Sequence, residues 1–468
     1  MKKLFTLFLT AAAALSLQAK VYTFEALSQI ENSGVTYADG VYTVAADASL
    51  SDAVDLDEGG ITVSKTQITI NEGNDLQLTG GEIVKFAGSV QLVVKGEALF
   101  NPEAGATFTA AEGSEATAKG IWVNGDAANA VVENIAFKYV GLTFSNGTGS
   151  GHLEMRNCTM DLFNGKNSQQ AVSFNASSDG HVIENCTFTG AMVSAIGSGS
   201  NTPVGIAIRN CTFLGNSTQK RNRPVINMSV GAYDITIENN LIKGLGVNTL
   251  AGGIAVSNLL GGAIGEAKIY VRNNVIQDNR YGITLTGKGN IFIEDNVIVN
   301  NHFESNPNIG GSGINITDAK GVANAFIRGN LITGSYWGVT VIGTTTTAVN
   351  MGKTDDPEAA DYNPGQNVLR DNGVDGVPYD LYNNSPATVY AQGNVWGVTK
   401  QTADQIATVI FDKNDDANLG EVIFGSNDDP QTFEPGDVNR DGVVSGTDVT
   451  ALYNILLGNE EGTEEPTE

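Results

Sequence analysis

The chain is poor in the residues that build disulfide frameworks and many catalytic centres. Of its 468 residues, three are cysteines, three are histidines and eleven are prolines. Basic residues are also scarce, because 26 lysines and arginines stand against 52 aspartates and glutamates, for a net charge of −26. Such a chain repels nucleic acid phosphates and anionic membrane surfaces, so we expect no nucleic-acid partner.

Long apolar segments are missing after the first residues. The chain begins MKKLFTLFLTAAAALSLQA, in which two lysines precede an apolar run that ends on small residues, a layout typical of a secretory signal peptide. The run is shorter than the roughly 20 residues that span a bilayer, which argues against a membrane anchor. We predict a signal peptide over residues 1–19, no membrane span, and a mature protein that is secreted, extracellular or at the cell surface.

Long amphipathic helices are missing until about the last thirty residues, and a short motif recurs instead. It is written VIENCTF, AIRNCTF, TIENNLI, YVRNNVI, FIEDNVI and FIRGNLI. One position of the motif holds residues that tolerate positive φ and therefore predicts a turn: Asn134, Asn157, Asn185, Asn210, Asn239, Asn273, Asp295, Gly329 and Gly393. Up to Gly329 these positions lie 22 to 34 residues apart, which indicates a stacked β-solenoid with inserted loops.

The residue before each turn alternates in charge. The series is Glu133, Arg156, Glu184, Arg209, Glu238, Arg272, Glu294 and Arg328. In parallel strands about 4.8 Å apart, each inner charge then lies between two opposite charges. We predict that the series lies on one solvent-facing sheet, one residue per coil, and prevents slips in register. The next member is either Arg370 or Gln392, and the sequence does not decide between them.

The residue after each turn is first a cysteine and later an asparagine: Cys158, Cys186 and Cys211, then Asn240, Asn274, Asn296, Asn330 and Asn394. Identical residues on one rung predict a stack in which each asparagine amide bonds its neighbours. For the cysteines we favour buried thiols. On distance alone, the coil spacing also permits a disulfide between Cys158 and Cys186.

With further strands such as GGIAVS, GITLTG and GINIT after each turn, the chain resembles the right-handed parallel β-helix (pectin lyase-like) superfamily. The superfamily includes pectate lyases, polygalacturonases and many non-catalytic surface proteins. The resemblance implies an all-β fold, a parallel β-helix over residues 20–424, followed by a linker over 425–435.

Catalytic residues stay unassigned. Polygalacturonases carry a Gly-His-Gly signature, whereas here Gly151-His152 and Gly180-His181 continue with leucine and valine, and the paired carboxylates of glycoside hydrolysis are not recognisable. A calcium-dependent lyase would need stacked carboxylates and a base. Arg221, Arg223 and Arg280 are the candidates for that base, with solvated loop arginines as the alternative.

Arg280, Tyr281, Tyr336 and Trp337 are the predicted carbohydrate contacts. They fall in loops just before the glycines that open the next strands. Aromatic rings there on successive coils would form a platform for sugar faces. The alternative is that they cap the edges of the coils.

The stretch GDVNRDGVVSGTDVTALYNILLG resembles one dockerin type I repeat over residues 436–458 and precedes an acidic tail over 459–468. The resemblance implies a Ca²⁺ loop followed by a short α-helix. Its oxygen ligands would be Asp437, Asn439, Asp441, the carbonyl of Val443, Ser445 and Asp448. A full dockerin has two such repeats, and this chain has one.

These features favour a secreted or surface protein that binds polysaccharide or is displayed toward it. A cohesin-like scaffold protein would then be the partner of the C-terminal repeat. A calcium-dependent uronate lyase is the alternative, and an adhesin or structural surface protein is the third.

Overall fold

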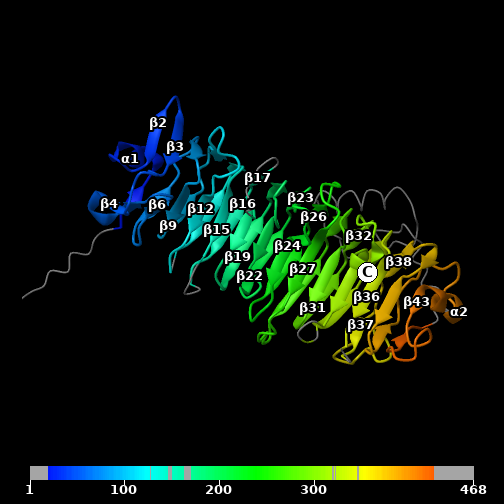
Figure 1. Cartoon of the computed structure of the whole chain (residues 1–468). Coiled ribbons are helices and arrows are strands. Elements are labelled where there is room, and N and C mark those ends of the chain that lie inside the picture. Colours follow the sequence, from blue (N-terminus) through cyan, green and yellow to red (C-terminus); the bar gives the residue numbers. More distant parts are fainter. Residues whose placement is uncertain are drawn as a thin grey trace, which may run out of the picture.

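The computed structural model describes residues 19–425 except 127, 146–149, 163–169, 319–320, 322 and 345–346. Its strands stack along one axis into three long sheets of 14, 13 and 15 strands, so the molecule is elongated from the N-terminal to the C-terminal coils (Figure 1). The predicted signal peptide and the predicted calcium repeat, with ligands Asp437 to Asp448, lie outside the described residues.

The first sheet carries the charged residue of each repeat. Its strands, in spatial order, are β1 (Val21–Tyr22), β7 (Asp75–Gln77), β10 (Ala98–Phe100), β13 (Ala130–Glu133), β16 (Leu153–Arg156), β19 (Ser178–Glu184), β22 (Val204–Arg209), β25 (Ile235–Glu238), β28 (Lys268–Arg272), β31 (Gly289–Glu294), β34 (Ala323–Arg328), β37 (Val349–Gly352), β42 (Val389–Ala391) and β44 (Val422–Ile423).

The second sheet follows the positive-φ turns, and most of its strands are short. They are β2 (Val35–Ala38), β3 (Val41–Ala45), β8 (Ile83–Ala87), β11 (Ala106–Ala110), β14 (Ile135–Lys138), β17 (Thr159–Asp161), β20 (Thr187–Thr189), β23 (Thr212–Leu214), β26 (Leu241–Lys243), β29 (Val275–Gln277), β32 (Val297–Val299), β35 (Leu331–Thr333) and β38 (Val368–Arg370).

The third sheet closes each coil. Its strands are β4 (Val54–Leu56), β5 (Ile61–Val63), β6 (Gln67–Ile70), β9 (Gln91–Val94), β12 (Gly120–Val123), β15 (Gly141–Phe144), β18 (Val172–Phe174), β21 (Ile196–Ser198), β24 (Arg223–Ser229), β27 (Ala251–Ser257), β30 (Ile283–Thr286), β33 (Ser312–Thr317), β36 (Trp337–Ile342), β41 (Leu381–Asn384) and β43 (Ile410–Phe411). A separate two-stranded sheet pairs β39 (Gly373–Val374) with β40 (Val377–Pro378).

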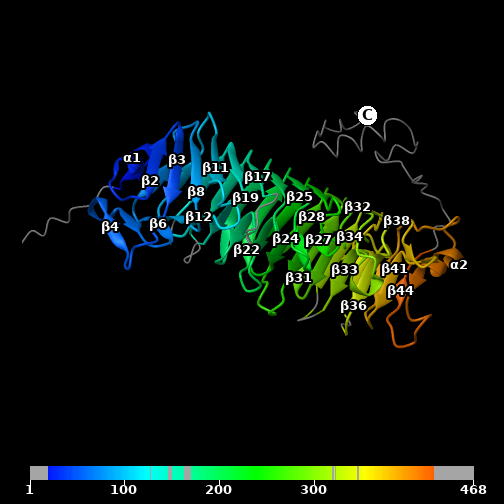
Figure 2. The ribbon, with the colours of Figure 1, turned by 45° about the horizontal axis from the view of Figure 1, so that its top comes forward.

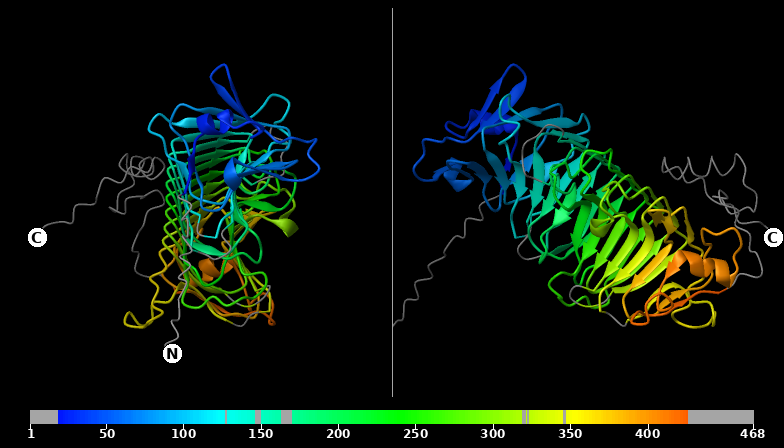
Figure 3. Two further views of the ribbon diagram at one scale, coloured as in Figure 1. Left: turned by 90° about the vertical axis from the view of Figure 1, so that its left-hand side faces the viewer. Right: turned by 45° about the vertical axis from the view of Figure 1, so that its right-hand side comes forward.

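Among the N-terminal strands, β2 pairs antiparallel with β3, and β5 with both β4 and β6, whereas from β7 to β41 each coil visits the three sheets in turn and pairs in parallel with the coil before it. Thus β28 pairs with β31, β29 with β32 and β30 with β33, all parallel. Viewed end-on, the three sheets surround the interior of the solenoid (Figure 3). The predicted β-solenoid is therefore confirmed.

The interior changes along the axis. On the second sheet one column of inward residues runs Phe108, Phe137, Met160, Phe188, Phe213, Ile242, Ile276, Ile298, Ile332 and Leu369. Every one of these side chains is buried. The rings of Phe188 and Phe213 stack with centroids 4.9 Å apart. Because the column is filled at every coil, the core is continuous rather than split into domains.

Short helices cover parts of the two ends. Helix α1 (Phe24–Gln29) buries Phe24 and Leu27, and its first turn is capped by the side chain of Thr23, which accepts from the Ala26 amide. Helix α2 (Ala403–Ile406) buries Ile406 near the last described coil. Such caps shield the terminal coils, which have a neighbouring coil on one side only.

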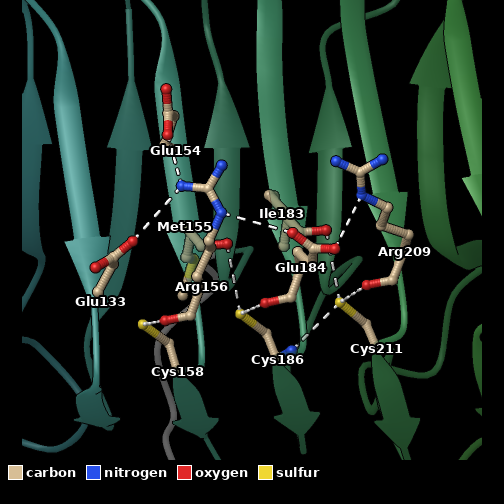
Figure 4. Close-up of polar contacts among 10 residues, drawn as sticks. All are labelled: Glu133, Glu154, Met155, Arg156, Cys158, Ile183, Glu184, Cys186, Arg209 and Cys211. Atoms are coloured by element: carbon tan, nitrogen blue, oxygen red, sulfur yellow. Dashed lines mark hydrogen bonds and ion pairs between the residues drawn. The ribbon is translucent and has the colours of Figure 1, made fainter. Parts of the chain in front are cut away.

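The predicted charge ladder is confirmed in full order, from Glu133 opposite Arg156 to Glu294 opposite Arg328. Figure 4 shows its first members on one face. The Arg156 guanidinium lies 3.5 Å from a carboxylate oxygen of Glu133 and 3.5 Å from one of Glu184. Later rungs are closer, with 2.7 Å between Arg272 and Glu238 and 2.8 Å between Arg328 and Glu294.

Neither proposed next member of the ladder follows Arg328. Arg370 lies in β38 of the second sheet, opposite Thr333, and Gln392 belongs to a later coil. The intervening coil turns at Gln366, which has a φ of 58°. An insertion between β37 and this turn separates the strand from its turn residue. The turn at Gln366 therefore does not follow the spacing of the repeated motif.

The asparagine stack is confirmed and gains a member. Side-chain amides donate to the next carbonyl oxygen at 2.8 to 3.0 Å through Asn240, Asn274, Asn296, Asn330, Asn367 and Asn394. Before them, Cys158, Cys186 and Cys211 are free, buried thiols in one row (Figure 4). Burial raises the pKa of Cys211 above its ordinary value, so this thiol stays protonated and unreactive.

Candidate functional site

Two corners of the coil differ in length and regularity. The asparagine corner, between the first and second sheets, is a two-residue turn such as Asn273–Asn274. The loop corner, between the second and third sheets, contains connections of different lengths, among them residues 278–282, 300–311 and 371–380. All four predicted carbohydrate contacts lie at the loop corner or at the start of the strand that follows it. Because the coils stack along one axis, this corner runs along the solenoid (Figure 2).

Arg280 is fixed at the loop corner by its backbone and by its side chain. Its amide donates to the Ala251 carbonyl at 2.7 Å, and its carbonyl accepts from the Gly311 amide at 2.7 Å. The side chain is only 8% exposed, and its Nη2 donates to Oδ1 of Asn222 at 2.6 Å. The guanidinium also lies 4.9 Å from the ring centroid of Tyr281. Arg280 is therefore held in place and is not a freely solvated loop arginine.

Tyr281 does not offer a ring face to solvent. It is 7% exposed, and a Cβ at Gly252 would overlap its ring, so the ring fills the space that this glycine leaves. Burial raises the pKa of Tyr281 to about 12. This finding removes Tyr281 from the expected sugar platform, and the alternative role of packing the coil edge describes it instead.

Tyr336 and Trp337 are half-buried and belong to a longer row of rings, which we name the aromatic strip. Its rings are His302, Tyr336, Trp337, Tyr379, Tyr382 and Phe411. Centroids of contacting rings are 4.6 to 6.1 Å apart, and the contacts run from His302 through Tyr336 and Trp337 to Tyr382, which contacts both Tyr379 and Phe411. The row is therefore continuous over several coils.

The sequence predictions included only Tyr336 and Trp337 from this strip and missed its other four rings. Tyr382 and Phe411 share a third-sheet register with Thr340, but their strands lack the opening glycine that marked the earlier coils. Tyr379 lies in a loop. In the third sheet, β41 lies between β36 and β43. This order places Tyr382 of β41 beside Trp337 of β36, and Phe411 of β43 beside Tyr382.

The same corner collects buried polar atoms that have no hydrogen-bond partner among the described residues. They are Oδ1 of Asn279, Nε of Arg280, Nδ1 of His302, Oγ of Ser335 and Nε1 of Trp337. Leaving a buried donor or acceptor unpaired costs about 1–3 kcal/mol. Atoms of this kind are rare in folded proteins, and here they gather beside the aromatic strip, which marks the corner as the candidate site.

Beside the charge ladder, the sequence did not predict a contact between His152 and Glu154. His152, just before β16, alternates with Glu154 and Arg156 of β16, and its Nε2 lies 3.2 Å from a carboxylate oxygen of Glu154. A hydrogen bond from Arg156 holds the pKa of Glu154 below its ordinary value. Because Arg156 is already shared with Glu133 and Glu184, it belongs to the charge ladder.

Comparison with known proteins agrees with this architecture. Residues 146–351 match the sequence family described as the right handed beta helix region, and residues 435–468 match the dockerin type I domain. The described part of the chain has the fold of a right-handed parallel β-helix. A search of curated proteins finds no match to this chain.

The chain also matches solved structures at low sequence identity and low TM-score. A tailspike protein of E. coli bacteriophage HK620 in complex with a pentasaccharide is 12% identical, with a TM-score of 0.29 over 71% of this chain and 60% of that chain. This chain therefore spans less than two thirds of the tailspike chain. A PL6 alginate lyase in complex with a trisaccharide is 15% identical, with a TM-score of 0.31 over 75% of this chain and 90% of that chain.

Within the described residues, no group of three or more His, Cys, Asp or Glu side chains is arranged to hold a metal ion. In the same part of the chain, no helix is long and apolar enough to cross a membrane. The ligands predicted for Ca²⁺, from Asp437 to Asp448, lie outside this part and stay a prediction.

Proposed function

We propose that the protein is a secreted or cell-surface β-helix that binds polysaccharide along the loop corner. The observation that carries the proposal is the aromatic strip beside unpaired buried polar atoms. Sugar rings combine apolar C–H faces with hydroxyl groups. Aromatic rings suit the faces, and a few placed polar atoms suit the hydroxyls.

The C-terminal repeat supplies the attachment in this proposal. Three carboxylates, from Asp437, Asp441 and Asp448, with further oxygens from Asn439, Val443 and Ser445, suit a hard cation such as Ca²⁺. The match of residues 435–468 to dockerin type I supports this role. A cohesin-like scaffold protein would be the partner, which places the polysaccharide-binding corner and the attachment in different parts of the chain.

Binding of the full chain to a panel of soluble polysaccharides, measured by affinity electrophoresis and calorimetry, tests the proposal. Trp337→Ala should weaken binding at least about tenfold, because stacking and burial on the ring are lost. Phe292→Ala is the matched control, since Phe292 is a half-buried ring on the outer face of the first sheet. Equal losses in both variants, or binding unchanged by Trp337→Ala, would refute the loop corner as the site.

A uronate lyase is the second candidate, and one observation favours it. Arg221 and Arg223 flank Asn222, whose Oδ1 accepts from Arg280, so the three arginines proposed as candidates for the base come from one part of the loop corner. The test is formation of unsaturated uronate product with and without calcium. Product formation that is lost in R221Q/R223Q would replace the binding role with catalysis.

A further inference from the structure

Four cationic side chains gather at the loop corner of a chain whose net charge is −26. We name Lys220, Arg221, Arg223 and Arg280 the basic patch. The first three are exposed, and Arg280 is buried beside them. Across the part of the chain that the structure describes, no carboxylate lies within 4.0 Å of these four cations, whereas the arginines of the charge ladder are paired with carboxylates.

The fold holds the basic patch together through specific contacts. Nη2 of Arg280 donates to Oδ1 of Asn222, which lies between Arg221 and Arg223. Arg223 pairs with Ala251 in the third sheet, and the Ala251 carbonyl accepts from the Arg280 amide. The loop before Arg223 is anchored by buried Asn248, whose amide donates to the carbonyls of Ser217 at 2.7 Å and Gln219 at 2.9 Å. These bonds set the position of the loop backbone and leave the cationic ends exposed.

Arg280 shows that the patch lacks negative charge. Its guanidinium is withdrawn from water, its Nε has no partner among the described residues, and one neutral oxygen accepts from its Nη2. A buried cation is stabilised by a nearby anion. Glu304 is influenced by this charge: its pKa is lowered first by a hydrogen bond from Thr249 and further by the charge of Arg280. Such a carboxylate can offset at most one of the four positive charges.

The basic patch adjoins the aromatic strip through two glycines. A Cβ at Gly310 would overlap the stem of Arg280, and a Cβ at Gly311 would overlap the ring of Tyr336. Both the Tyr336 and the Trp337 amides donate to the Gly311 carbonyl, at 2.8 and 3.1 Å. A ligand chain lying on the strip therefore reaches the cations without leaving the corner.

We infer that the polysaccharide bound at the loop corner is anionic, and that the basic patch binds its carboxylate or sulfate groups. Guanidinium groups bind such anions through paired, charge-assisted hydrogen bonds. This inference rests on the proposed function. It adds the class of ligand, since a neutral polysaccharide needs the aromatic strip alone.

The test measures binding of the full chain to polygalacturonate, dextran sulfate and neutral dextran, with calcium chelated so that it cannot bridge anions. At least one anionic polymer should bind more tightly than dextran. R221Q/R223Q should weaken that binding at least about tenfold and leave dextran unchanged. The matched control K65Q/K119Q removes the same amount of charge from exposed sites in the N-terminal coils. It should change neither the binding of the anionic polymer nor the binding of dextran. Binding to polygalacturonate alone would indicate a uronic acid, and binding to dextran sulfate alone a sulfated sugar.

Several results would overturn the inference. If R221Q/R223Q leaves anionic binding unchanged while Trp337→Ala abolishes binding, the proposed function stands and the basic patch is not part of the site. Polyglutamate that binds as tightly as the sugar polymers would show a general anion site. Failure of every polymer to bind the correctly folded chain would refute both the inference and the proposed function.

Discussion

The asparagine corner and the loop corner solve the same geometric problem in different ways. At the asparagine corner a two-residue turn repeats, and each buried amide in the stack donates to the next at 2.8 to 3.0 Å. At the loop corner the connections change length, and several buried polar atoms have no partner among the described residues. The stacked amides of the first corner are therefore satisfied within the fold, whereas the second corner combines satisfied amides, such as that of Asn372, with buried polar atoms that have no partner among the described residues.

This difference indicates where stability and binding reside. A buried polar network contributes to stability only when its members are satisfied, which describes the asparagine stack. Residues that bind ligands are commonly placed on loops held by a rigid scaffold, which describes the loop corner. Substitutions at the two corners should therefore separate loss of stability from loss of binding.

The largest effect on stability is expected inside the asparagine stack. Oδ1 of Asn296 accepts from both the backbone amide and the side-chain amide of Asn274, and its Nδ2 donates to the Val271 carbonyl and to Asn330. Asn296→Ala leaves these buried groups unpaired and should lower the free energy of unfolding by about 3 kcal/mol or more, measured by urea denaturation.

Asn324→Ala, at an exposed site on the outer face of the first sheet, is the control for this prediction. It should change the free energy by less than about 0.5 kcal/mol. Equal losses for the two asparagines would show that the stack adds nothing specific to the fold.

The second effect depends on pH. His181 is 2% exposed, its Nδ1 accepts from the Leu153 amide at 3.0 Å, and its Nε2 bonds Ser178 at 2.8 Å. Burial lowers the pKa of His181 to about 3. Below the ordinary histidine pKa of about 6.5 the unfolded chain binds a proton that the folded chain excludes. Stability should therefore fall between pH 6.5 and 3, by up to about 1.4 kcal/mol per pH unit.

Buried Asp380 opposes this trend, because burial raises its pKa to about 6 and its contribution to stability rises as the pH falls toward its ordinary pKa. The contribution of His181 is therefore measured as a difference between two proteins, the natural chain and His181→Gln, in how steeply stability changes with pH. Denaturation midpoints measured from pH 7 to 4 should show a shallower slope for His181→Gln. His152→Gln, at a half-buried histidine, is the control. An identical pH slope in all three proteins would contradict the assignment to His181.

A smaller effect is expected on the charge ladder. Arg209 lies 3.1 Å from Glu184 and pairs in register with Glu238 on its other side. Arg209→Glu sets three like charges on adjacent strands and should destabilise by about 1–2 kcal/mol, whereas Arg209→Gln should lose under about 1 kcal/mol. Measuring the denaturation midpoints of both variants at increasing salt concentration checks that the cause is electrostatic. Salt screens charges, so it should reduce the difference in midpoint between Arg209→Glu and Arg209→Gln. Equal losses at low salt would show that the ladder does not select register.

The smallest effect on stability is expected at the loop corner. R221Q/R223Q alters two exposed side chains, so its free energy of unfolding should stay within about 0.5 kcal/mol of the natural chain. The same double substitution is expected to weaken binding of an anionic polysaccharide. A large loss of stability would mean that the basic patch is part of the structural framework, and the contrast between the corners would fail.

Much of the solenoid was predictable from local pattern. The charged residue and the turn residue recur together in one short motif. Because parallel pairing repeats that motif at each coil, the order of the ladder from Glu133 to Arg328 follows from the sequence. The prediction failed at Arg370 and Gln392, because an insertion separates β37 from its turn at Gln366. A local motif carries no information on how an inserted loop returns to the coil.

The loop corner was only partly predictable. Arg280, Tyr336 and Trp337 do lie at one corner, as their common position before a glycine indicated. The burial of Tyr281 over Gly252 depends on contacts with another coil, and so do the contacts of Tyr382 with Trp337 and with Phe411.

The sequence by itself determined the coil, its register and its asparagine stack, because each depends on a residue type at a fixed distance from a turn. Only the tertiary structure decided which side chains meet at the loop corner and which of them stay exposed. The physical reason is that burial at this corner results from loops of unequal length, contributed by coils distant in sequence. Their contacts follow from packing in space rather than from any repeated spacing.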